Sequence, residues 1–165
     1  MAVLPDIART YRQPARMQAA RIGTGDERLA LAYAMISCGL IFVGQWPVQA
    51  RRAHLEGADL DQLLGASLMG WIFVAPLLLY GIALAVHWGS RLIGRPVSGF
   101  ASRMALFWAL LAAVPLWLLN GLTAAMVGPG AALDIVGGLA LGAFLAFWAA
   151  GLWAARRMDA APSGA

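Results

Sequence analysis

The side chains most able to do chemistry in this sequence are three polar residues that lie within long apolar stretches. Asp134 is the acid nearest to the middle of such a stretch, and Asn120 and Thr123 lie near the end of the preceding one. An ionisable residue inside a membrane is a functional candidate because burying its charge is costly. One interpretation is a protonatable cluster of these residues on a transport path. The other, which the sequence favours, is an acid in the first turn of a helix, stabilised by the helix dipole and reaching interfacial water.

Residues that bind metals are too few to form a site. A metal site needs several ligands, but the chain has two histidines, His54 and His87, which are expected on opposite sides of the membrane. Cys38 is the single cysteine, so no disulfide can form within one chain. The sequence also lacks a paired nucleophile and base, a Walker loop and a GxGxxG motif. We therefore expect no metal, no cofactor and no enzymatic activity.

Two glycines four residues apart, Gly138 and Gly142, match the small-xxx-small pattern of closely packed membrane helices. They form a candidate helix-packing interface. The pattern does not say whether the partner helix belongs to this chain or to another one.

The elements that must position these residues are long apolar helices. The chain is 61% apolar and 12% charged, with a mean hydropathy of +0.72. Residues 67–88 carry no charged side chain and are long enough for a helix to cross the roughly 30 Å hydrocarbon core. Similar stretches surround them. The sequence predicts an all-α, polytopic membrane bundle with short interfacial helices and four transmembrane helices at residues 29–46, 67–88, 104–127 and 131–155.

The sequence also predicts kinks within two of these spans and the structure of two segments between them. Pro76 and Pro115 lie in the middle of the second and third spans, where a proline removes a backbone hydrogen bond and favours a kink. Residues 128–130, Gly-Pro-Gly, predict a tight turn between the third and fourth spans. Residues 48–66 combine charged side chains with leucines at helical spacing, and we expect an amphipathic segment along the membrane surface.

Both ends of the chain are polar. Residues 1–28 form an amino-terminal segment with a possible interfacial helix at about residues 15–22, because Pro14 can open a helix at its first turn. A partly ordered tail is the alternative. The small, polar residues 158–165 predict a disordered tail.

The charge pattern indicates membrane orientation. All twelve basic residues are arginines, and they flank the apolar spans without a run longer than two, which is unlike a nucleic-acid-binding groove. Only Arg51 and Arg52 lie in the connections expected on one side. Because positively charged segments stay in the cytoplasm, we expect both termini to be cytoplasmic.

Several short motifs resemble the Yip-one (Ypt-interacting protein) family of membrane proteins, in the form found in alphaproteobacteria. The resemblance covers about residues 5–157. It is carried by Pro14–Arg16 (PAR), Ile41–Pro47 (IFVGQWP), Trp71–Gly81 (WIFVAPLLLYG), Ala105–Leu122 (ALFWALLAAVPLWLLNGL) and Gly128–Gly130 (GPG).

The resemblance implies a non-enzymatic, multi-pass protein of the bacterial cytoplasmic (inner) membrane. Eukaryotic members of the family bind small GTPases and partner membrane proteins, but they have five spans and an Asp-Leu-Tyr-Gly-Pro element that this chain lacks, so GTPase binding is not carried over. We expect a scaffold, assembly factor or accessory subunit that contacts lipids and other integral membrane proteins, and no nucleic acid. The alternative is a small transporter or channel built on the two proline-containing spans with Asp134 and Asn120.

Overall fold

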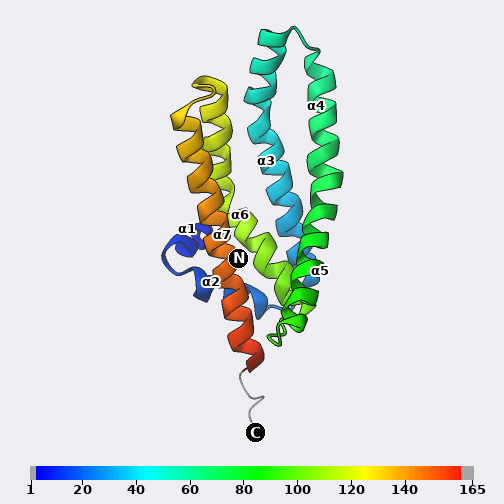
Figure 1. Ribbon diagram of the computed structural model, residues 1–165, viewed down its shortest axis with the longest axis vertical. Helices are drawn as coiled ribbons and strands as arrows, with labels where there is room; N and C mark the ends of the chain where they lie inside the picture. The colour runs from blue at the N-terminus through cyan, green and yellow to red at the C-terminus, as the bar shows by residue number, and fades with distance from the viewer. Residues whose placement is uncertain (1–2, 161–165) are drawn as a thin grey trace.

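The computed structural model describes residues 3–160, and helices account for nearly all of this part, which contains no strand. The predicted all-α fold is confirmed. Figure 1 shows the helices arranged as an elongated bundle. In chain order they are α1 (Val3–Arg12), α2 (Pro14–Ile22), α3 (Glu27–Glu56), α4 (Leu60–Met69), η1 (Gly70–Val74), α5 (Ala75–Leu92), α6 (Gly99–Met126) and α7 (Ala131–Ala160).

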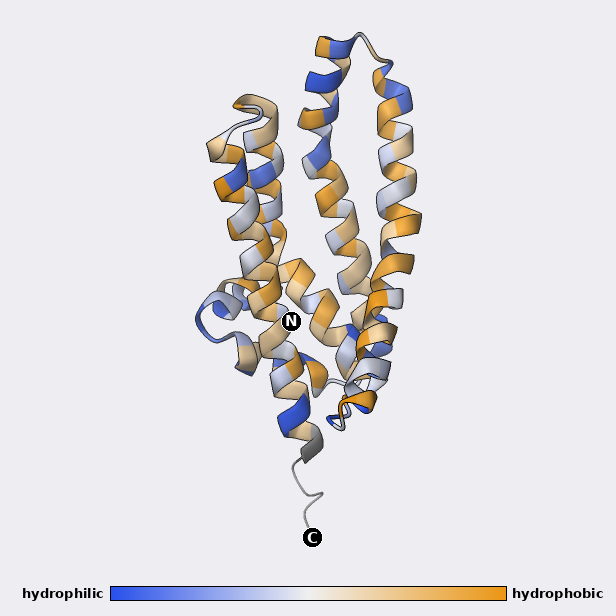
Figure 2. Cartoon of the chain, in the orientation of Figure 1, coloured by the Kyte–Doolittle hydropathy of each residue, from blue (hydrophilic) through white to orange (hydrophobic). Residues whose placement is uncertain are grey.

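Four helical rods are long and apolar enough to cross a membrane: α3, the continuous run from α4 through α5, α6 and α7. Each predicted span falls on one of them. The rods are longer than the predicted spans; α3 and α7 contain 30 residues each, which at 1.5 Å per residue is about 45 Å of helix. Figure 2 shows apolar residues along the middle of the rods and hydrophilic residues towards their ends. The predicted tail begins inside α7, and residues 161–165 lie outside the described part.

The connection between the first two rods corrects one prediction. Residues 48–66 do not form a separate helix along the membrane surface. Instead α3 continues through Pro47 to Glu56, the chain turns at Gly57, and α4 runs back beside α3 in the opposite direction (Figure 1). A single proline removes only one backbone hydrogen bond, so α3 tolerates it, whereas Gly57 adopts φ +65°, a left-handed conformation that ends a helix.

The two mid-span prolines have different surroundings. Just before Pro76 the helix widens into the π-helical turn η1, in which the backbone N–H of Ala75 bonds to the carbonyl of Gly70. π-Helical turns are rare and occur mostly as single turns inside α-helices, where they are one cause of a kink. Pro115 lies inside α6, which stays helical throughout. Figure 1 shows α6 changing direction midway, oblique in its lower half and upright above.

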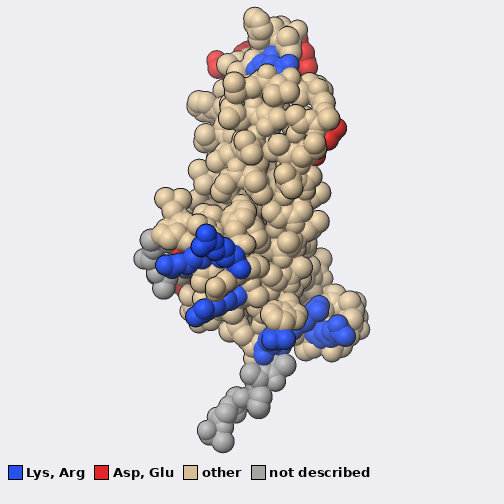
Figure 3. Space-filling model, turned by 90° about the vertical axis from the view of Figure 1, so that its left-hand side faces the viewer, with Lys and Arg blue, Asp and Glu red and all other residues tan. Residues whose placement is uncertain are grey.

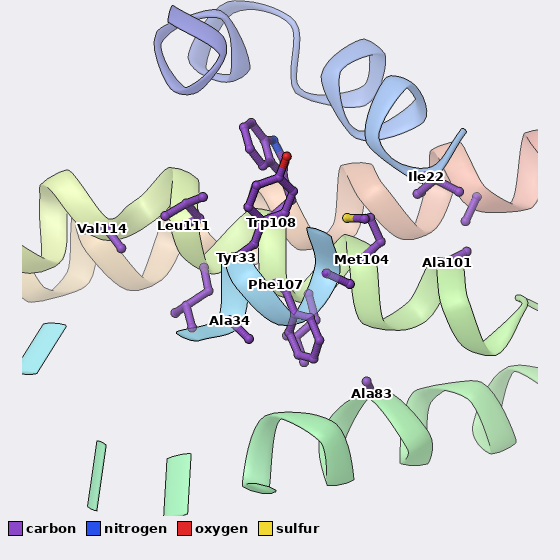
Figure 4. Packing of buried hydrophobic residues seen from close by; sticks show 14 of the residues in the cluster. Ile22, Tyr33, Ala34, Ala83, Ala101, Met104, Phe107, Trp108, Leu111 and Val114 are labelled. Carbon is purple, nitrogen blue, oxygen red and sulfur yellow. The ribbon is translucent and has the colours of Figure 1, made fainter. Parts of the chain in front are cut away.

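The core of the bundle forms around α6, which is the most buried of the four rods and contacts α2, α3, α5 and α7. Its first half supplies the largest fully buried side chains, including Met104, Phe107 and Trp108. Tyr33 of α3 packs edge-on against Trp108, with ring centroids 5.1 Å apart (Figure 4). By contrast, few residues of α5 and α7 are buried, and several of their large apolar side chains are exposed.

The predicted turn at residues 128–130 is present between α6 and α7, and an arginine from another helix stabilises it. Arg51 Nη1 donates hydrogen bonds to the carbonyl oxygens of Ala125 (2.9 Å) and Ala124 (3.3 Å), in the last turn of α6. A positive charge at a helix carboxyl end is favoured by the helix dipole. The guanidinium lies against Gly128, which has φ +87°. One side chain of α3 thereby satisfies carbonyl groups in the last turn of α6.

Two glycines allow α3 and α6 to cross closely. A Cβ atom at Gly121 would lie 2.3 Å from the carbonyl oxygen of Gly44, a separation that real side chains do not reach. A Cβ atom at Gly44 would lie 2.8 Å from Leu118 Cδ2. Small residues at such crossings let helix backbones approach and gain van der Waals contact.

We predict that Gly121→Ala destabilises the protein by about 1–3 kcal/mol, because the methyl group overlaps backbone that cannot move independently. The matched control is Gly39→Ala in α3, where a Cβ atom meets nothing within 4 Å. There the better helix propensity of alanine should leave stability unchanged or raise it by about 1 kcal/mol. Thermal denaturation in mild detergent measures both variants, and equal melting temperatures would contradict the close crossing.

Candidate functional site

The three polar residues predicted to form an intramembrane cluster make no hydrogen bond to one another in the part of the chain that the structure describes. Asn120 faces α7, where its Oδ1 would lie 3.2 Å from a Cβ atom at Gly137. The Thr123 hydroxyl donates to the carbonyl of Leu119, 2.8 Å away, within its own helix. Asp134 is exposed in the first turn of α7, and its side chain makes no hydrogen bond or ion pair with the described residues. This arrangement matches the alternative of an acid placed at a helix amino end.

The glycine pair of the predicted packing motif faces away from the rest of the chain. Gly138 and Gly142 are exposed, and a Cβ atom at either would meet nothing within 4 Å. The internal contacts of α7 use other small residues instead, among them Gly137 and Gly151. The motif therefore provides no packing within this chain.

Sequence reasoning missed the polar contacts by which α1 and α2 bind the bundle. Figure 1 shows both helices beside the lower half of α6 and α7. The indole Nε1–H of Trp108 donates to the hydroxyl of Thr10, 3.2 Å away, and the hydroxyl of Tyr11 donates to the carbonyl of Ala112, 3.0 Å away. Burial raises the pKa of Tyr11 above its ordinary value, so the phenol remains protonated and able to donate this bond.

Gln18 of α2 reaches furthest into the bundle and is fully buried. Its Nε2 donates to the carbonyl of Ala105 in α6 (3.2 Å) and to that of Phe147 in α7 (3.1 Å). Gly151 makes room for it, because a Cβ atom there would lie 2.8 Å from Gln18 Cδ. One amide therefore joins three helices, and α7 needs a glycine at that point.

Arg21 lies at the centre of the contacts by which α1 and α2 pack against the bundle, and only 5% of its surface is exposed. Its guanidinium pairs with Asp6 of α1, donates to the hydroxyl of Tyr33 at 3.0 Å, and lies 4.5 Å from the ring centroid of Trp108. A buried charge is tolerated when it is paired and hydrogen-bonded, and the face of a tryptophan adds cation–π attraction. Arg21 thus connects α1, α2, α3 and α6.

A separate groove of about 630 Å³ opens between α5 and the start of α6. Polar groups line one part of it. The ring nitrogen Nδ1 of His87 is 2.7 Å from the carbonyl oxygen of Val97, and Arg103 pairs with Glu27 of α3. Its remaining lining is largely apolar, including Leu77 and Leu84. In residues 3–158 no group of three or more His, Cys, Asp or Glu side chains could hold a metal ion.

Comparison with known protein families, with curated proteins and with solved structures finds no match for this chain. The resemblance to the Yip-one family stays a prediction, carried by the sequence motifs alone. The candidate functional features of the described residues are the docked amino-terminal helices, the groove beside α5 and the open glycine face of α7.

We predict that Arg21→Gln releases α1 and α2 from the bundle. The variant removes a buried ion pair and the cation–π contact, and breaking a buried pair costs about 3–5 kcal/mol. Backbone amides of residues 3–22 should then exchange with deuterium on the order of a hundredfold faster in detergent, whereas those of α6 keep their protection. The control is Arg28→Gln, which changes an exposed arginine nearby. Unchanged exchange in Arg21→Gln would show that the docking does not depend on this residue.

Proposed function

We propose that this protein is a non-enzymatic integral membrane protein that acts as a scaffold, assembly factor or accessory subunit for another membrane protein. The observation that carries the proposal is the outward face of α7, where Gly138 and Gly142 stand exposed and unused by the chain's own packing. Ala146, one further helical step along, is exposed as well. This stripe of small residues fits a helix of a partner protein.

Physical reasons favour a protein over lipid on this stripe. Helices in a membrane associate through van der Waals contact and gain most of it where small residues let backbones approach. This chain already uses glycines in that way where α3 crosses α6. Large apolar side chains, including Ile135 and Leu139, are exposed near the stripe, with 63% and 60% of their surfaces accessible. They would pack around the partner helix.

The proposal includes a location and an orientation. We infer a bacterial cytoplasmic membrane with both termini in the cytoplasm. Support comes from the arginines. Arg51 and Arg52 lie near the upper end of α3. The other described arginines belong to α1 and α2, the start of α3, the end of α5, the loop from α5 to α6, the start of α6 and the end of α7. Figure 1 shows these segments in the lower half of the bundle. The Yip-one resemblance agrees with a role in organising other membrane proteins.

We predict that the double variant Gly138→Leu, Gly142→Leu loses a partner that co-purifies with the tagged wild-type chain in mild detergent, because the added side chains keep the partner helix away. The matched control is Gly81→Leu, Ala85→Leu, which enlarges a small, exposed pair at the same spacing on α5. Mass spectrometry and native-gel sizing report the complex. Retention of the partner by the α7 variant, or equal loss from the α5 variant, would refute the α7 interface.

One observation supports a transporter or channel as a second candidate. The Oδ1 atom of Asn120 is buried between α6 and α7 without a hydrogen-bond partner among the described residues, and a functional role is one of the explanations for such a group. In that case a protonatable Asp134 would be needed for transport.

We expect instead that Asp134→Asn leaves proton or ion flux into proteoliposomes unchanged, because the carboxylate is exposed and makes no bond to Asn120. A tenfold loss of flux would favour transport.

A further inference from the structure

Three exposed arginines line one hollow where α1 ends and α2 begins. Arg9, Arg12 and Arg16 surround a space of about 400 Å³, together with Gln13 and Met17. Figure 3, which faces the side of the molecule that carries α1 and α2, shows basic side chains gathered there. Arginine presents a planar fork of donors that suits phosphate and carboxylate groups.

The positive charge of this hollow is only partly balanced. Arg9 lies 3.2 Å from the carboxylate of Asp6, but Arg21 binds the same carboxylate. Among the described residues, the guanidinium of Arg16 donates a hydrogen bond only to the neutral amide oxygen of Gln13, 3.4 Å away. The side chain of Arg12 makes no ion pair or hydrogen bond with the described residues. The contrast is the groove beside α5, where Arg103 is paired with Glu27.

The start of α2 adds backbone donors to the same place. The helix begins at Pro14 after Gln13, whose side chain does not cap it. The first N–H groups of a helix have no partner within it, and those of Ala15 and Arg16 make no backbone hydrogen bond outside α2 to the described residues. A helix amino end binds anions because these N–H groups and the helix dipole act together. Three arginines therefore line one hollow beside the amino end of α2.

The hollow also lies at the depth expected for phospholipid headgroups. The docking contacts of α1 and α2 reach Ala105, Trp108 and Ala112 of α6. From Met126 at the end of α6, the helix runs about 21 Å to Ala112, the contact of α1, and about 31 Å to Ala105, the contact of α2, and the longer of these lengths is close to the thickness of the hydrocarbon core. If the upper boundary lies near Met126, α1 and α2 lie at the lower one. The buried contacts of Gln18 and Arg21 hold them there.

We propose that the hollow formed by Arg9, Arg12 and Arg16 binds the phosphate of an anionic membrane phospholipid. Charge favours an anion, and the depth of the hollow favours a lipid over a soluble phosphate compound. Each arginine near an anionic membrane surface contributes about 1 kcal/mol, so the three together favour an anionic over a zwitterionic lipid by well over tenfold. The site is independent of the partner surface on α7.

The test uses the full-length chain purified in dodecyl maltoside and native mass spectrometry with added phosphatidylglycerol or phosphatidylcholine. We expect phosphatidylglycerol to bind at least about tenfold more tightly than phosphatidylcholine. The triple variant Arg9→Gln, Arg12→Gln, Arg16→Gln should lose that preference. The control Arg28→Gln, Arg91→Gln, Arg95→Gln removes the same charge from exposed arginines outside the hollow and should keep it.

Two further measurements separate the remaining explanations. Replacing Arg9, Arg12 and Arg16 by lysine keeps the charge but removes the forked donors, and we expect binding between that of the wild type and that of the glutamine variant. Melting temperatures verify that each variant is folded. Equal binding of the two lipids, equal loss in the control variant, or displacement of phosphatidylglycerol by an equal concentration of inorganic phosphate would each overturn the lipid site.

Discussion

Backbone amide groups in the hydrocarbon core have no water to bond, so each long helix must satisfy its own backbone hydrogen bonds. The helices then associate mainly through van der Waals contact between their surfaces. In this protein that contact depends on α6. Its first half buries Met104, Phe107 and Trp108, and its second half touches the backbone of α3 at Gly44 so closely that Gly121 cannot carry a side chain. The other rods pack around α6. Helices α3 and α7 contact it extensively, and α5 contacts it less.

The same helix also provides the surface on which the amino-terminal segment docks. Polar side chains of α1 and α2 reach carbonyl oxygens of α6 and α7, and the buried Arg21 pairs with Asp6 over the face of Trp108. Polar docking of this kind needs well-defined geometry, because each donor must meet its acceptor to offset the loss of water. The amino-terminal helices are therefore integrated into the fold, and their outward arginines are held in place.

The parts of the molecule that bear on function are consequently distinct. The inner faces of the rods are occupied by α6, whereas the small-residue stripe of α7 is left open to the membrane. The basic hollow lies on α1 and α2, and its position follows from their docking. A partner helix on α7 and a lipid headgroup at the hollow would use different residues. Both could be bound at once, which suits a protein that positions other components in a membrane.

The sequence by itself determined the all-α architecture and the four long helices, because the length of an uncharged apolar run already decides whether a helix can cross hydrocarbon. It also identified the glycine pair, the prolines and the turn at residues 128–130. Only the tertiary structure decided which way these residues face. Gly137 and Gly138 are neighbours in the chain, yet one packs against Asn120 and the other is open, since adjacent helical residues point about 100° apart. The burial of Gln18 and Arg21 depends on helices far away in the sequence, so local patterns could not reveal it.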